Sequence, residues 1–236
     1  MRRFFVPAAQ IPVITGSDAH HIRDVLRMKA GDRIELLDGK GAVYLSEIER
    51  IEKNKVVCKI LESRELKVES RIKITLAQAL PKASKMDFIV EKCTELGSYQ
   101  IIPMSTERTV AGKAKLDRWK KIAKSAAEQS GRTIIPEITP LMKFEDVLKT
   151  RNQFDLALIP WELEKENTLK KVLTTYPPNN PTTIIILVGT EGGFSQKEIK
   201  QARAAGFIPV SLGNRILRTE TAGMAVLAAV MYEFEG

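Results

Sequence analysis

Two glycine-containing loops near the C-terminus hold the residue types best suited to ligand binding and chemistry. The first runs from Gly189 to Ser195 and includes Glu191 between its glycines. The second runs from Leu212 to Thr221 and ends in Arg218-Thr219-Glu220-Thr221. Each loop follows an apolar stretch and precedes a helical pattern, so backbone N–H and C=O groups of both would face one shared pocket.

The first loop lacks the patterns of the common phosphate sites. No Lys-Ser or Lys-Thr pair follows its glycines, and its spacing is not Gly-x-Gly-x-x-Gly. Glu191 and Glu220 are acidic, which disfavours phosphate and favours a cation, a hydroxyl or an amino group. On these residues alone two interpretations stay open, a site for a small polar ligand or two ordinary strand-to-helix turns.

The residues around the loops predict the elements that must position them. The β-branched run Thr183–Val188 is typical of a strand buried on both faces. Ser195 with Glu198 has the spacing of a capping box, which starts a helix. Ile208–Leu212 is the next expected strand. Thr219–Phe234 is expected to be a closing helix, apolar almost all round, that needs cover from the core and from a second subunit.

The rest of the chain divides into two parts at a polar linker, residues 62–71. After the linker we expect strands at 72–80, 99–103 and 154–159, and helices at 86–96, 116–130 and 166–175. This alternation favours a parallel α/β sheet. Before the linker we expect strands at 34–37, 42–48 and 56–61 and a short helix over 17–26, which could close into a small barrel. The expected domains are therefore residues 1–70 and 71–236.

The net charge of +8 is concentrated in one short window of the 236 residues. Residues 108–132 hold eight Lys and Arg against two Asp and Glu. A basic cluster of this kind indicates a polyanionic partner, and a solvated helix face is the alternative.

Cysteine, histidine and hydropathy patterns exclude several classes of protein. Cys58 and Cys93 form no Cys-x-x-Cys pair, and the two histidines are adjacent, so we expect no zinc site or other metal. The start of the chain is too short in apolar residues for a signal peptide. The longest apolar run, Ala222–Tyr232, is about half of the ~20 residues that span a bilayer. We therefore expect a soluble, cytoplasmic protein without a membrane partner.

Motifs along nearly the whole chain together resemble one known family. They are Met1–Phe5, His20–His21, Gln78–Lys82, Lys85–Asp87, Glu91–Gly97, Ala126–Arg132, Gly189–Ser195 and Leu212–Ala222. In this order they resemble the RsmE family of 16S ribosomal RNA methyltransferases, in the SPOUT superfamily. One departure is Thr190, where the family usually has proline. Threonine adds an N–H and frees the backbone torsion, which predicts a looser loop.

The resemblance implies a fold, an activity and partners that the residue patterns do not show. Residues 1–70 would be a PUA-like RNA-binding β-barrel. Residues 71–236 would be an α/β SPOUT methyltransferase domain with a C-terminal deep trefoil knot, an exception to unknotted chains. The protein would be a homodimer. It would use S-adenosyl-L-methionine to methylate N3 of a uridine in 16S rRNA within the 30S ribosomal subunit.

The chemistry of this reaction suggests roles for the loop residues. Uracil N3 is a protonated imide and needs a base or stabilisation of its anion. We expect Arg218 to steady that charge, and Glu220 or Glu191 to take the proton or to hold the cofactor's amino group. Helix capping is the alternative role for Glu220. The candidate cofactor-binding residues are Leu187, Val188, Gly189, Gly192, Leu212, Gly213, Ile216, Leu217, Thr221 and Ala222.

The basic residues supply candidates for RNA contact. They are Arg2, Arg3, Arg23, Arg27, Arg108, Arg118, Lys121, Lys124 and Arg132, with Lys113 and Lys115 between them. Phosphate contacts of this kind add affinity without reading sequence. The alternative function is a non-enzymatic RNA-binding or ribosome-assembly factor with an idle pocket. A methyltransferase with another RNA target is a further alternative.

Overall fold

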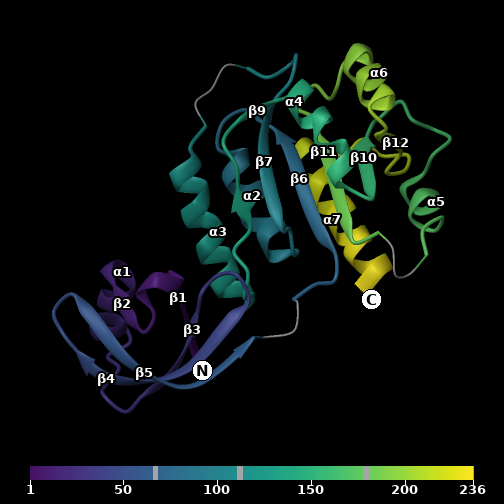
Figure 1. The fold of residues 1–236 in the computed structure, drawn as a ribbon. Coiled ribbons are helices and arrows are strands. Elements are labelled where there is room, and N and C mark those ends of the chain that lie inside the picture. Colours follow the sequence, from purple (N-terminus) through teal and green to yellow (C-terminus); the bar gives the residue numbers. More distant parts are fainter. Residues whose placement is uncertain (66–68, 111–113, 178–180, 236) are drawn as a thin grey trace. The chain divides into compact units, whose positions relative to one another are not determined.

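The computed structural model describes residues 1–65, 69–110, 114–177 and 181–235, and it divides into two compact units. The first unit comprises residues 1–69 and 127–135, and the second comprises residues 70–126 and 136–236. Figure 1 shows the elements of both units along the chain. Lys113 and part of the expected linker lie outside the described residues.

The first unit is built on a five-stranded sheet with the order β1-β3-β4-β5-β2. Its elements are β1 (Arg2–Phe5), η1 (Ala8–Gln10), β2 (Val13–Thr15), α1 (Gly16–His20), the π-helical turn η2 (His21–Val25), β3 (Arg33–Leu37), β4 (Ala42–Ile51) and β5 (Lys55–Glu65). The pairing of β1 with β3 is parallel, and the other pairings are antiparallel. Among the described residues, no pairing joins the edge strands β1 and β2 to close a barrel.

A late segment of the chain completes this first unit. Phe5, Leu37 and Val43 form a buried cluster with Ala127, and Ile135 packs against it. Arg3 donates a hydrogen bond of 2.8 Å to the carbonyl of Gly131. The segment 127–135 therefore belongs to the core of a unit whose other residues all precede residue 70.

The second unit is a parallel sheet with the order β12-β10-β11-β6-β7-β8, with β9 also pairing with β7. Its elements are β6 (Lys73–Ala79), α2 (Lys85–Glu95), β7 (Gln100–Ser105), α3 (Leu116–Ser130), β8 (Glu137–Ile138), β9 (Met142–Lys143), α4 (Phe144–Lys149), η3 (Arg151–Gln153), β10 (Leu156–Pro160), α5 (Leu169–Leu173), β11 (Thr183–Val188), α6 (Gln196–Ala204), β12 (Ile208–Val210) and α7 (Thr219–Glu235). The last turn of α3 clusters with the first unit.

Strand β11 is covered on both faces, as its β-branched sequence predicts. Ile185 and Leu187 pack into a buried cluster with residues of α4 and α6. On the other face α7 contacts β6 and β11. A Cβ at Gly223 of α7 would lie 3.3 Å from Leu76 and 3.6 Å from Val188, so the glycine lets the helix approach the sheet closely. Alternate side chains of β11 thus pack on opposite faces of the sheet, one face against α4 and α6 and the other against α7.

The structure corrects several expected elements. Strand β5 continues to Glu65, so the expected linker at 62–71 is wrong over its first four residues. The helix expected at 166–175 is shorter, because Thr168 caps it with a hydrogen bond from Lys171 N–H. Strands β1 and β2 and helix α4 were not predicted. No helix of the described ranges is long and apolar enough to cross a membrane.

Candidate active site

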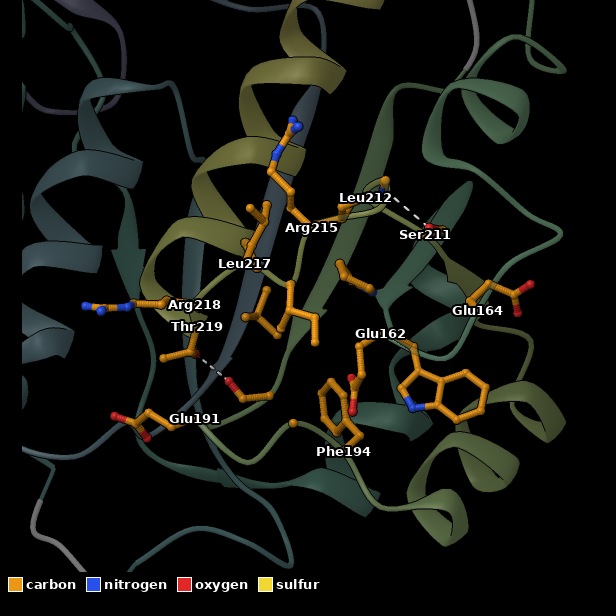
Figure 2. A pocket seen from close by; sticks show the side chains of 18 of the residues that line it. Glu162, Glu164, Glu191, Phe194, Ser211, Leu212, Arg215, Leu217, Arg218 and Thr219 are labelled. Carbon is orange, nitrogen blue, oxygen red and sulfur yellow. Dashed lines mark hydrogen bonds between the residues drawn. The ribbon is translucent and has the colours of Figure 1, made fainter.

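A cavity of about 950 Å³ opens where parallel strands β10, β11 and β12 end. The two glycine loops form much of its wall (Figure 2). The carboxyl ends of parallel strands are the usual place for ligands in α/β sheets. The volume lies within the range typical of small-molecule sites.

The first loop depends on close backbone approach at Gly189. A Cβ there would lie 2.9 Å from the carbonyl carbon of Gly193, which no neighbouring side-chain movement could relieve. Gly193 has a φ of 66°, and its N–H donates a 2.9 Å hydrogen bond to the carbonyl of Thr190. The Thr190 hydroxyl accepts a bond of 3.3 Å from the N–H of Gly192. Thr190 therefore forms two hydrogen bonds inside the loop, one through its carbonyl and one through its hydroxyl. The sequence analysis expected this loop to be looser than one with proline at position 190.

A buried hydrogen-bond network ties the first loop to β6 and α7. The amide nitrogen of Gln78 donates to the Thr219 hydroxyl at 2.9 Å and to the Gly189 carbonyl at 3.3 Å. The Thr219 hydroxyl also donates to that carbonyl, at 2.5 Å (Figure 2). Both side chains are buried. The carbonyl of Gly189 is therefore fixed in direction by two donors from other elements.

The structure brings most of the candidate cofactor-binding residues together at the cavity. Those on its wall are Val188, Gly189, Gly192, Leu212, Gly213, Ile216, Leu217 and Ala222. Leu187 instead points into the core on the other face of β11. Thr221 is exposed on α7 and is not part of the wall. The hydroxyl of Ser211, which the sequence analysis did not name, accepts a 3.3 Å bond from Gly213 N–H.

One side of the cavity carries two of the three candidate catalytic residues, Arg218 and Glu191, whereas Glu220 is half-buried and is not part of the wall. Figure 2 shows Arg218 and Glu191 on the same side, with Thr219 between them. The Arg218 guanidinium is exposed and bonds to no other group in the part of the chain that the structure describes. Lys85 lies on the wall and pairs with Glu191 at 3.0 Å and with Glu220 at 3.3 Å. The sequence analysis quoted Lys85 in a motif but gave it no role.

Two further acidic residues lie across the cavity from Arg218 (Figure 2). Burial opposes ionisation of Glu164, but N–H bonds from Asn167 and Glu166 and the charge of Arg203 hold its pKa below the usual value. Glu162 is exposed and forms no ion pair or hydrogen bond within the described ranges. Both follow β10, and their place after a strand of a parallel sheet is the signal that could have identified them.

A loop after β7 supports the first glycine loop from outside. The Glu107 N–H donates to the Glu198 carboxylate at 2.9 Å, and the Ser195 hydroxyl donates to the Glu107 carboxylate at 2.8 Å. The Ser195–Glu198 capping box is present as predicted. Arg108 donates to the carbonyl of Gly192. This RNA-contact candidate therefore lies against the first glycine loop.

The other candidates for RNA contact differ in their exposure and in whether they form ion pairs within the protein. Arg2, Arg27 and Lys121 are exposed. Arg3 pairs with Glu35 and Arg23 with Asp24. Arg118 is exposed and pairs with Asp87, while Lys124 is half-buried. Arg132 is buried and pairs with Glu69 at 2.9 Å, so its charge is compensated inside the first unit and is not offered to phosphate.

Sequence comparisons match both parts of the chain to one kind of protein. Residues 68–231 match the RNA methyltransferase domain, and residues 14–61 match the RNA methyltransferase PUA domain. The ribosomal RNA small subunit methyltransferase E of Bacillus subtilis is 32% identical over 100% of this chain and 98% of its own. The protein of the same name from Synechocystis is 37% identical over 92% of this chain and 71% of its own.

Solved structures of similar proteins agree with the fold. One is a ribosomal RNA small subunit methyltransferase E from Neisseria gonorrhoeae bound to S-adenosyl methionine, with a TM-score of 0.84 and 33% identity over 98% of this chain and 97% of that one. Another is a probable rRNA-methyltransferase from Porphyromonas gingivalis, with a TM-score of 0.90 and 29% identity over 100% and 99%. These likenesses extend over both units.

Proposed function

The chain belongs to the ribosomal RNA small subunit methyltransferase E family, and we propose that it methylates N3 of a uridine in 16S rRNA with S-adenosylmethionine. The observation that carries this proposal is the pairing of a glycine-walled cavity with an unpaired guanidinium, that of Arg218, at its edge. The cavity can hold a cofactor, and the Arg218 guanidinium can stabilise negative charge on a nucleobase.

The cavity residues fit the chemical parts of the cofactor. Val188, Leu212 and Leu217 supply apolar wall for an adenine, and the glycine backbones supply hydrogen bonds to its edge. The acidic side chains on the wall suit the cofactor's hydroxyl and amino groups better than phosphate. Bound there, S-adenosylmethionine supplies an activated methyl group on a sulfonium.

The catalytic roles follow from the chemistry of uracil N3. The site must accept the N3 proton, and it must stabilise the negative charge that then spreads onto the uracil oxygens. We assign charge stabilisation to Arg218, whose guanidinium has no internal partner within the described ranges. Glu220 and Glu191 are the carboxylates on the same side of the site.

The experiment that tests this function follows a labelled methyl group from S-adenosylmethionine to unmodified small ribosomal subunits. Label should appear in 16S rRNA, and mass mapping should place it on a uridine base. A folded protein that binds the cofactor in calorimetry but transfers no methyl would overturn the proposal. Absence of saturable cofactor binding as well would favour the non-enzymatic RNA-binding factor.

RNA contact through helix α3 is a separate part of the proposal. The N3 position lies on the Watson–Crick edge, so the target base must be unpaired or flipped. Reversing two charges in Lys121→Glu/Lys124→Glu should weaken RNA binding and lower the slope of log affinity against log salt by about one unit per lost phosphate contact. The measurement is a salt titration of RNA binding.

A matched double variant controls for net charge in that titration. Lys197→Glu/Lys200→Glu reverses two exposed lysines on α6, the same change in total charge. It should leave the salt slope close to that of the unmodified protein. Equal slopes for both double variants and the unmodified protein would show that α3 is a solvated face only.

A homodimer is supported by the outer face of α7. Thr221, Ala228 and Tyr232 are exposed along one stripe of this helix, and Tyr232 is 81% exposed. Phe88, on the helix α2 that packs against α7, is 46% exposed. Large exposed side chains such as Tyr232 and Phe88 on two packed helices are typical of an interface. Light scattering should therefore report twice the chain mass, and a monomer would contradict the proposal.

The proposal also includes the knot and the cellular location. The family membership supports a deep trefoil knot formed by the chain after Thr183, with α7 passing through a preceding loop. Mechanical extension of a knotted chain would leave its contour length short of the fully extended value. The proposed 16S rRNA substrate in the 30S subunit supports a cytoplasmic location, which cell fractionation would test.

A further inference from the structure

Lys85 joins the three elements that meet at the catalytic side of the cavity. It is the first residue of α2, and its Nζ lies 3.0 Å from Glu191 Oε1 in the first glycine loop. The same Nζ lies 3.3 Å from Glu220 Oε2 at the start of α7. The side chain is part of the cavity wall and is 34% exposed. The Lys85 ammonium thus contacts both Glu191 and Glu220, the two candidate acceptors of the N3 proton.

The two carboxylates are held differently. Glu191 is partly desolvated, which opposes ionisation, but its own N–H, the Lys85 ammonium and the Lys82 N–H hold its pKa below the usual value. The Lys82 N–H lies 3.1 Å from one Glu191 oxygen and 3.4 Å from the other. The Glu191 carboxylate therefore contacts both the Lys82 N–H and the Lys85 ammonium, and it links the loop after β6 to the loop after β11. A carboxylate held this way is a weak base.

Glu220 has fewer partners than Glu191. Its Oε2 is buried and accepts no hydrogen bond in the part of the chain that the structure describes, and it is held by its ion pair with Lys85 at 3.3 Å. A buried polar atom without a hydrogen bond is rare in folded proteins and points to a functional role. Around Glu220 the charged groups are Lys85 from α2, Glu191 from the loop after β11, and Arg218 two positions before it.

We propose that Lys85 is a positioning residue that holds Glu220 in place as the acceptor of the uracil N3 proton, with Glu191 anchoring the lysine. This inference rests on the proposed methyl transfer. Hydrogen bonding to Glu191 raises the pKa of Lys85, burial opposes the rise, and Glu220 adds to it. The lysine therefore remains an ammonium near neutral pH and cannot itself be the base.

The proposed step balances in atoms and charge. The N3 proton passes to a Glu220 oxygen, and the N3 electron pair forms the new bond to the methyl carbon. The carbon–sulfur bond breaks, and its electron pair stays on sulfur, which becomes a neutral thioether. Glu220 then releases the proton to solvent. Arg218 steadies the uracil oxygens while the N3 proton is leaving.

The test compares two quantities, the single-turnover rate with saturating RNA and cofactor, and the dissociation constant for S-adenosylmethionine. In Lys85→Met the ion pair that holds Glu220 is lost, so the rate should fall by about tenfold. The dissociation constant should change by less than about threefold. Lys85→Arg keeps the charge and should restore most of the rate.

Helix α2 offers a matched control in Lys92. Lys92 also bridges two glutamates, Glu91 at 2.8 Å and Glu95 at 2.7 Å, and is 33% exposed. Lys92→Met therefore removes an equivalent surface ion pair two turns away, and should leave the rate within about twofold of that of the unmodified protein. A Lys85→Met rate as high as that of Lys92→Met, or a loss that Lys85→Arg does not restore, would overturn the inference.

A second variant keeps the inference testable if Lys85→Met fails to fold. Glu220→Gln is nearly isosteric and should lower the rate by at least 10²-fold while leaving cofactor binding within about threefold. A rate close to that of the unmodified protein would show that Glu220 is not the base. Methyl transfer by the unmodified protein is measured first, because its absence would concern the proposed function and not Lys85.

Discussion

Replacing Arg218 with alanine should lower the single-turnover rate of methyl transfer by about 10²–10³-fold, the usual cost of removing a donor from a developing anion. The dissociation constant for S-adenosylmethionine should change by less than about threefold, because the guanidinium points away from the apolar cofactor wall (Figure 2). Rapid-quench assays give the rate, and calorimetry gives the cofactor affinity. An Arg218→Lys variant should recover part of the rate.

Arg215 provides the control for the Arg218 experiment. It lies three positions earlier in the same loop, is also exposed, and is directed away from Arg218 (Figure 2). Arg215→Ala thus removes the same charge from the same loop and should lower the rate by no more than a few-fold. If the two alanine variants lose the same amount, Arg218 contributes only general attraction for RNA.

Replacing Gly189 with alanine should weaken cofactor binding by at least about tenfold, equivalent to ~1.4 kcal/mol. The new Cβ would lie 2.9 Å from the carbonyl carbon of Gly193, so the loop must move as a backbone unit. That movement breaks the hydrogen bonds that Thr219 and Gln78 donate to the Gly189 carbonyl. Overpacking of this kind costs roughly 1–3 kcal/mol. Calorimetry with S-adenosylmethionine is the direct measurement.

Gly192→Ala is the graded comparison within the same loop. Its Cβ would meet the flexible side chain of Arg108 at 3.3 Å, which can move aside. We expect a weaker effect, of no more than a few-fold on affinity. Comparable losses of affinity in both variants would show that the Gly189–Gly193 contact does not explain the effect of Gly189→Ala.

Local patterns were enough to predict the elements that carry the cavity. Strand β11 has the predicted bounds, because a β-branched run covered on both faces is hard to mistake. Helix α3 also has its predicted bounds, set by a stripe of apolar residues at helical spacing. Strand β1 was missed because four residues have no periodicity of their own. Its identity comes from parallel pairing with β3, about thirty residues later.

The site was less predictable than the elements, because its contacts join distant segments. Glu162 comes within 3.2 Å of a Cβ built on Gly193 because β10 and β11 are parallel neighbours. Lys85, Glu191 and Glu220 belong to three separate segments, and no spacing along the chain relates them. Periodicity predicts which face of an element is buried, but only the strand order determines which loops meet.

The first unit is built from two separate segments of the chain, which limits how it can be moved into another protein. Residues 127–135 complete a core whose other residues precede residue 70, so no single cut separates a whole module. A gene fusion carrying residues 1–69 alone would transplant Phe5, Leu37 and Val43 without the cover of Ala127 and Ile135. Such a graft should be less soluble than one that also carries residues 127–135. A functional PUA-like unit can therefore be transferred only together with the end of α3 and the residues that follow it.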